Sequence, residues 1–120
     1  MSPISGGASG PAGQVALGLR FEFYDEDCHL IAALVREDVK GAAVPRPGEQ
    51  IGAGSLSPLV HDLVGASPIV DHLDHYLRVP RSRDWAPLTV VVAHVREITV
   101  DQLNDVEDAL DAEGWSLLRA

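Results

Sequence analysis

Large apolar side chains alternate with small or polar ones between Val15 and Tyr24. The apolar members of this stretch are Val15, Leu17, Leu19, Phe21 and Phe23. A period of two is typical of a strand with one buried face and one exposed face. The acidic segment Asp25–Asp27 and a second apolar stretch, Leu30–Val39, come next. Together the two stretches predict a β-hairpin.

Further strands are predicted at Ile69–Val79 and Leu88–Ile98, with a short one at Ile51–Gly54. The segment Pro80–Pro87 separates the two longer strands, and its flanking prolines exclude it from a hydrogen-bonded ladder. The run from Leu88 onwards is apolar at successive positions, as in a strand that is buried on both faces. We therefore expect Leu88–Ile98 to be the central strand.

Two helices are predicted from their end signals. Ser57 as N-cap, Pro58 at the first helical position and Gly65 as a stop indicate one or two helical turns. The stretch Thr99–Glu113 carries six carboxylates and no Lys or Arg. Its capping-box pattern and the glycine that follows it predict a longer amphipathic helix, with an apolar side formed by Val100, Leu103, Val106 and Leu110.

The order of these elements predicts an α+β fold. We expect a curved antiparallel sheet or a small, partly open barrel of about five strands, with one short helix and a C-terminal amphipathic helix over one face or end. Trp115, Leu117 and Leu118 form an apolar tail that would fold back on the sheet. Residues 1–13 are rich in small residues and predict a flexible tail, and residues 14–120 form a single domain.

Composition narrows the range of functions. The 120-residue chain has a formal charge of −9, which disfavours binding to nucleic acids and to anionic membranes. It contains no apolar stretch long enough for a membrane span. Cys28 is the only cysteine, so an internal disulfide cannot form. We expect a reduced cytoplasmic protein.

The acidic helix supports the leading functional hypothesis. At 100° per residue, Asp101, Asp105 and Asp108 form a narrow stripe opposite the apolar side, and Asp111 adds charge near the end of the helix. Such a run is commonly a solvated face. Without intervening cations, it also suits a non-catalytic module of the immunity, inhibitor or adaptor type that recognises a basic protein partner.

The segment Pro80–Pro87 carries a second candidate surface. It contains Arg81, Arg83 and Trp85, and Arg and Trp are enriched at interface hot spots. In a self-association hypothesis, this segment of one molecule docks on the acidic helix of another. Alternatively, Trp85 packs beneath the segment while Asp84 pairs with an Arg.

The competing hypothesis is a small enzyme or ligand binder that depends on a metal or a His–Asp pair. His72, Asp74 and His94 are its candidate residues, since imidazole and carboxylate groups bind zinc and act as acid–base catalysts. Strict alternation would place His72 and Asp74 on one face and Asp71 and His75 on the other. Because no diagnostic metal motif, nucleophile elbow or phosphate loop is present, the sequence predicts no cofactor. A third hypothesis is a structural subunit whose tail is ordered by its neighbours.

Overall fold

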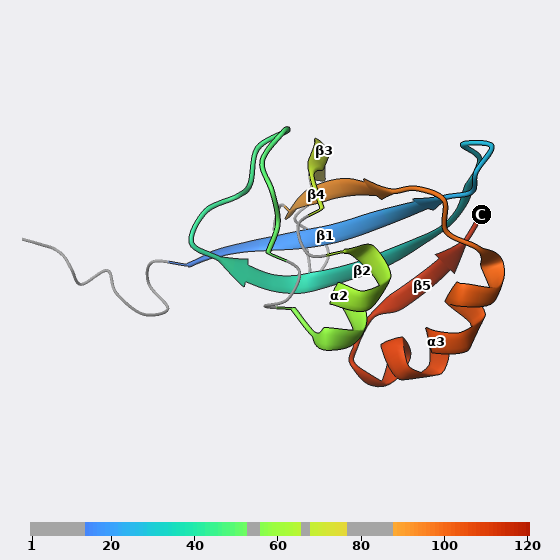
Figure 1. Ribbon diagram of the computed structural model, residues 1–120. Coiled ribbons are helices and arrows are strands. Elements are labelled where there is room, and N and C mark those ends of the chain that lie inside the picture. Colours follow the sequence, from blue (N-terminus) through green and yellow to red (C-terminus); the bar gives the residue numbers. More distant parts are fainter. Residues whose placement is uncertain (1–13, 53–55, 66–67, 77–87) are drawn as a thin grey trace, which may run out of the picture.

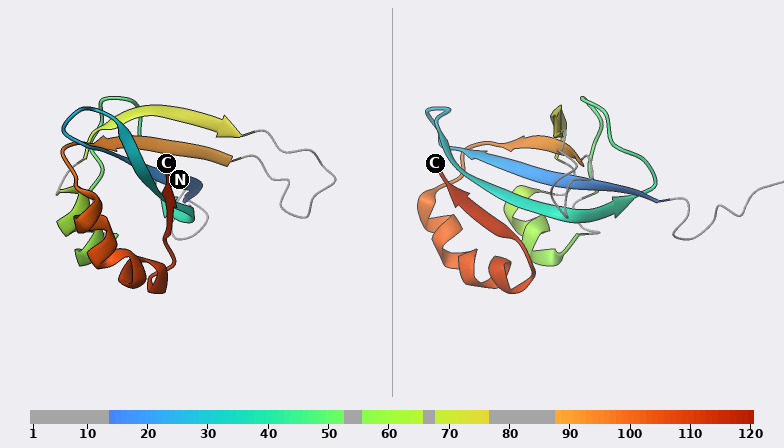
Figure 2. Two further views of the ribbon diagram at one scale, coloured as in Figure 1. Left: turned by 90° about the vertical axis from the view of Figure 1, so that its right-hand side faces the viewer. Right: turned by 180° about the vertical axis from the view of Figure 1, so that it is seen from behind.

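The computed structural model describes residues 14–52, 56–65, 68–76 and 88–120. Its elements are, in chain order, β1 (Val15–Tyr24), β2 (Leu30–Gly41), α2 (Pro58–Val64), β3 (Val70–Tyr76), β4 (Leu88–Val95), α3 (Val100–Ala112) and β5 (Ser116–Arg119). The strands form one sheet in the order β3-β4-β1-β2-β5, and both helices lie against the same face of it (Figures 1 and 2).

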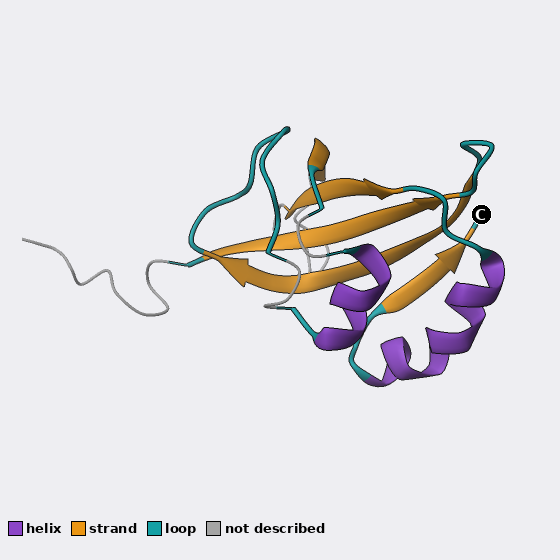
Figure 3. Ribbon diagram, viewed as in Figure 1, coloured by secondary structure: helices purple, strands orange, loops and turns teal. Residues whose placement is uncertain are grey.

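The predicted α+β class, with a C-terminal helix beside the sheet, is confirmed (Figure 3). The sheet is open and mixed. The pairs β1–β2, β3–β4 and β2–β5 are antiparallel, whereas β1 and β4 run parallel. After β2, the chain passes to the other side of β1 and forms the edge strand β3. The next strand, β4, runs antiparallel to β3, fills the place between β3 and β1, and is therefore parallel to β1.

The core lies between the helices and one face of β1. The apolar alternation of β1 places Leu17, Leu19, Phe21 and Phe23 on this face, each at most 3% exposed. Val60 of α2 and Leu103 and Leu110 of α3 pack into the same cluster. Burial of these side chains against the sheet explains why both helices share one face.

Both helices begin as their end signals predict. The Ser57 hydroxyl accepts a hydrogen bond from the Val60 N–H, and α2 ends at Gly65, which has a φ of 90°. Thr99 and Gln102 form the complete capping box of α3. After α3, the chain turns through Gly114 and places Trp115 against Phe21, with 6.1 Å between ring centroids.

Some elements differ from the sequence-based predictions. The C-terminal tail packs on the sheet by joining it as strand β5, which pairs with β2. The centre of the sheet is β1, while β4 lies between β1 and the edge strand β3. The short strand expected near Ile51 is an isolated bridge between Gln50 and Ile69.

Two predictions lie outside the described residues. These are the tail at residues 1–13 and the segment that contains Arg81, Arg83 and Trp85. In the part of the chain that the structure describes, no helix has the length and apolar character needed to cross a membrane.

The packing of α3 predicts a large difference between two aliphatic truncations on this helix. Leu103→Ala should lower the free energy of unfolding by about 2–5 kcal/mol, because Leu103 is fully buried and its truncation leaves a cavity. Val100→Ala should change it by less than about 0.5 kcal/mol, because Val100 is 49% exposed. Urea denaturation followed by circular dichroism measures both. Equal losses would show that α3 is not anchored through Leu103.

Candidate functional site

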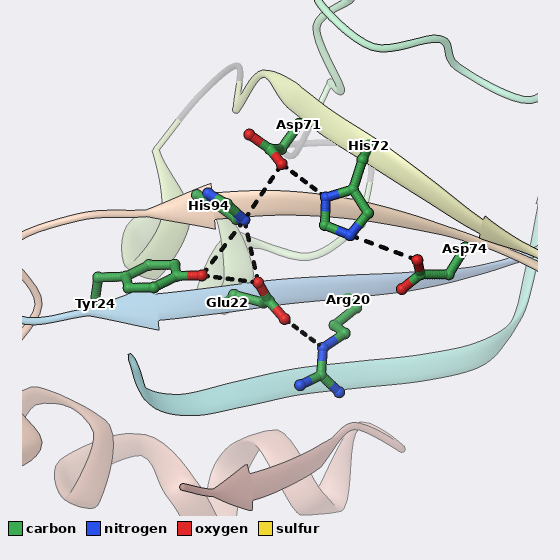
Figure 4. A network of polar contacts seen from close by, with 7 residues as sticks. All are labelled: Arg20, Glu22, Tyr24, Asp71, His72, Asp74 and His94. Carbon is green, nitrogen blue, oxygen red and sulfur yellow. Dashed lines mark hydrogen bonds and ion pairs between the residues drawn. The ribbon is translucent and has the colours of Figure 1, made fainter. Parts of the chain in front are cut away.

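Polar side chains gather on the open face of the sheet, opposite the helices (Figure 4). The alternation that turns the phenylalanines of β1 toward the core turns Arg20, Glu22 and Tyr24 the other way. These side chains are half-buried rather than fully solvated. They form one side of a cluster that β3 and β4 complete.

The parallel pairing of β1 with β4 places Glu22 beside His94. Glu22 Oε1 lies 3.1 Å from His94 Nε2, and the two side chains are 15% and 19% exposed. The Tyr24 hydroxyl donates to the same Glu22 oxygen at 2.9 Å and lies 3.5 Å from His94 Nε2. Arg20 Nε donates to Glu22 Oε2 at 2.8 Å. Glu22 is therefore held at both oxygens.

A β-bulge in β3 adds Asp71 to the cluster. The register with β4 shifts between Val70 and His72, so Asp71 does not follow simple alternation. Asp71 Oδ2 lies 2.7 Å from His72 Nδ1 and 3.6 Å from His94 Nε2. The expectation that Asp71 and His72 lie on opposite faces is therefore wrong, because the inserted residue re-aims the Asp71 side chain.

The structure brings together two of the three metal candidates taken from the sequence, His72 and His94. Their ring centroids are 6.1 Å apart, and Asp71 lies between them. Asp74 lies on the far side of His72, with 3.6 Å between Asp74 Oδ1 and His72 Nε2. His75 contacts the Thr89 hydroxyl at 3.1 Å and takes no part in the cluster.

The contacts between these groups shift their pKa values. The hydrogen bond between Asp71 and His72 lowers the pKa of Asp71 and raises the pKa of His72. Burial raises the pKa of Glu22, but hydrogen bonds from Arg20 and Tyr24 outweigh it and lower this pKa overall. Burial and the bond to Glu22 raise the pKa of Tyr24. At neutral pH both carboxylates are therefore ionised and the phenol is protonated.

The cluster has more acceptors than donors around His94. Its Nε2 carries at most one proton, yet the carboxylates of Glu22 and Asp71 both approach it. The other ring nitrogen, Nδ1, is buried and has no hydrogen-bond partner among the described residues. His94 Nε2 can therefore donate to only one of these two carboxylates at a time.

Asp71, His72 and His94 each offer one ligand atom within 4.8 Å of the others, as a bound metal ion would require. A second such group, Asp25, Asp27 and His29, lies in the β1–β2 turn. In that group, Asp25 already accepts hydrogen bonds from the backbone N–H groups of Asp27 and His29, which accounts for its position. The cluster on the sheet differs in that it also joins residues far apart in the sequence, since Asp71 and His94 lie on different strands.

The acidic stripe of α3 lies on the other side of the molecule. Asp101, Asp105, Asp108 and Asp111 are all exposed. The ion pair described on this helix joins Glu107 to Arg119 at 2.6 Å and does not involve the stripe. The stripe and the polar cluster are therefore separate candidate surfaces.

Comparison with protein-family models, curated proteins and solved structures finds no match.

Sequence reasoning missed Arg20, Glu22 and Tyr24 as site residues and set Asp71 apart from His72. A signal for the first three was present. They are successive polar residues on one face of a ten-residue strand whose other face is apolar. The bulge at Asp71 has no comparable signal, because it depends on how β3 pairs with β4.

The Asp71–His72 bond predicts a stability contribution that depends on pH. A raised pKa for His72 stabilises the fold fully below the ordinary value of 6.5, and the effect is lost as the pH rises through the folded-state pKa. A lowered pKa for Asp71 stabilises fully above 3.8 and is lost as the pH falls through the folded-state value. In metal-free protein, Asp71→Asn should therefore destabilise most between these two values.

Thermal unfolding and NMR titration of the histidine ring protons test this prediction. Asp71→Asn should lower the pKa of His72 more than Asp74→Asn does, because the hydrogen bond to Asp71 is the largest cause of the shift and Asp74 acts through charge alone. A destabilisation that is the same from about pH 3 to about pH 9 would contradict the assignment.

Proposed function

We propose that the protein binds one divalent transition-metal ion on the open face of the sheet, through Asp71, His72 and His94, and uses this ion as a Lewis acid. The observation that carries this proposal is the bulge in β3, which turns a carboxylate toward two imidazoles supplied by different strands. This function corresponds to the metal-dependent enzyme or ligand binder among the hypotheses from the sequence, and not to the purely non-catalytic module.

The distances between the donor atoms are compatible with a shared ion. Ligand atoms about 2.0–2.1 Å from a metal lie about 2.9–3.4 Å apart in tetrahedral or octahedral geometry. Asp71 Oδ2 is 2.7 Å from His72 Nδ1 and 3.6 Å from His94 Nε2, which brackets this range. The ligand atoms of His72 and His94 lie within 4.8 Å of each other, so binding would require the side chains to close around the ion.

The surrounding residues supply outer contacts. A histidine that ligates a metal usually donates its other ring N–H to a carboxylate. If His72 ligates through Nδ1, its Nε2 faces Asp74, 3.6 Å away. His94 departs from this pattern, because its Nδ1 has no partner in the described part of the chain.

Two imidazoles and one carboxylate suit zinc or ferrous iron better than magnesium or calcium, which prefer oxygen ligands. With three protein ligands, such an ion keeps positions free for water or substrate and supplies a Lewis acid. Glu22 lies beside His94, and its lowered pKa keeps it a carboxylate. It could accept a hydrogen bond from a water or substrate at this position, while Arg20 and Tyr24 fix its orientation.

Metal titration tests the proposal. Protein purified without a histidine tag and stripped of metal should bind zinc, or cobalt as a spectroscopic substitute, at a stoichiometry near one. His94→Ala should weaken the affinity at least about tenfold, because removal of an outer contact alone costs about 10–100-fold. Isothermal titration calorimetry and the visible bands of bound cobalt measure the effect.

Two matched variants locate the site. His75→Ala should leave the affinity unchanged, since His75 lies on β3 but outside the cluster. His29→Ala removes the histidine of the second group of potential ligands, in the β1–β2 turn. If zinc binding survives His94→Ala and is lost in His29→Ala, or if the parent protein binds no zinc below about 100 μM, the proposal is wrong.

A further inference from the structure

A groove between the two helices forms a second candidate site, on the face of the molecule opposite the polar cluster. It has a volume of about 280 Å³. Leu59 and Leu63 of α2 and Val106 of α3 supply its apolar lining, and all three side chains are only partly covered by the core. The groove therefore offers apolar surface that the folded chain leaves accessible.

Acidic side chains border this apolar lining. Asp62 and Asp105 line the groove together with Gln102. The side chain of Asp62 is 84% exposed. Its carboxylate lies 3.5 Å from His61 Nδ1, and this contact is an ion pair only when His61 is protonated. Asp101 and Asp108 lie exposed on the same helix as Asp105. The rim is thus negative around an apolar centre.

The arginines near α3 are committed elsewhere. Arg119 donates to Asn104 and Glu107. Arg36 donates to Asp38 and to the carbonyl oxygen of Glu113 at the end of the helix. Among the described residues, no Lys or Arg ion pair reaches Asp62, Asp105 or Asp108. The negative charge of the groove is therefore available to an external cation.

We infer that this groove docks a basic amphipathic helix of a partner protein. Aliphatic side chains of that helix, spaced at i and i+3 or i+4, would enter the lining between α2 and α3. Its Lys or Arg side chains would lie against Asp62, Asp105 and the neighbouring acidic residues. A groove between two helices suits a third helix, and the charge pattern selects a basic one.

The same charges disfavour other occupants. A second copy of this chain also carries a net charge of −9, so two copies repel each other at long range. A purely polar polycation would leave Leu59, Leu63 and Val106 without a partner. Exposed ion pairs alone contribute little, so burial of aliphatic groups in the groove has to provide most of the affinity.

A peptide titration of the full-length protein tests the inference. The probe is a 14-residue helical peptide of Lys, Ala and Leu with its leucines on one face, and the control peptide has the same composition in scrambled order. With ¹⁵N-labelled protein, the amphipathic peptide should shift amide signals of α2 and α3 around the groove. The scrambled peptide should bind at least tenfold more weakly, since it has the same charge but no apolar face.

Paired variants separate local recognition from net charge. Asp105→Asn with Asp108→Asn should weaken binding of the amphipathic peptide at least tenfold. Glu26→Gln with Asp27→Asn, in the β1–β2 turn, makes the same change in net charge and should alter the affinity less than twofold. Val106→Ser should weaken binding without a change in charge. These surface variants are expected to retain the fold, which their spectra verify.

Four results would overturn the inference. One is equal weakening by the two acidic pairs, which would make net charge the cause. Another is a set of shifted signals outside α2 and α3. The third is the absence of binding at 1 mM peptide in low salt. Self-association of the unliganded protein through this groove, seen by light scattering as a mass that falls in the Val106→Ser variant, would identify a second copy as the occupant and would also contradict the inference.

Discussion

The strict alternation of β1 is the constraint on which the rest of the structure depends. β1 pairs with β2 on one side and β4 on the other, so both of its edges are used. One of its faces supplies Phe21 and Phe23 to the core, and the other supplies Glu22 and Tyr24 to the polar cluster. A shift of its register by one residue would exchange these two sets and bury the carboxylate among the helices. The same backbone periodicity therefore fixes both the core and the site.

The parallel pairing of β1 with β4 has a consequence that an antiparallel hairpin would not have. Parallel strands must be joined by a connection that leaves the sheet and returns. In this chain the connection contains β2, α2 and β3, and β3 then pairs with β4 from the opposite edge. Residues near positions 22, 71 and 94 meet as a result. The cluster is a product of topology, and no contiguous sequence motif encodes it.

Local signals predicted the elements of the fold well. The alternation of β1, the Ser57 cap of α2 and the capping box of α3 each depend on residues that lie close in sequence, and the structure contains all three. The pairing of the strands was less accessible, because parallel and antiparallel neighbours produce similar apolar runs. For the site, His72 and His94 could be named from residue type alone. Asp71 could not be assigned to the same face, because a bulge is defined by the partner strand.

The distribution of charge gives the two faces of the sheet different chemistry. On the open face, carboxylates are bonded to Arg20, Tyr24 and His72, so their negative charge is directed at defined donors. On the helical side, the aspartates of α3 are exposed, and their charge acts at longer range until salt screens it. A small ion that needs close ligands suits the first arrangement, and a large basic surface suits the second. Because the buried core separates the two surfaces, occupation of one does not require contact with the other, and the two proposed sites can be tested independently.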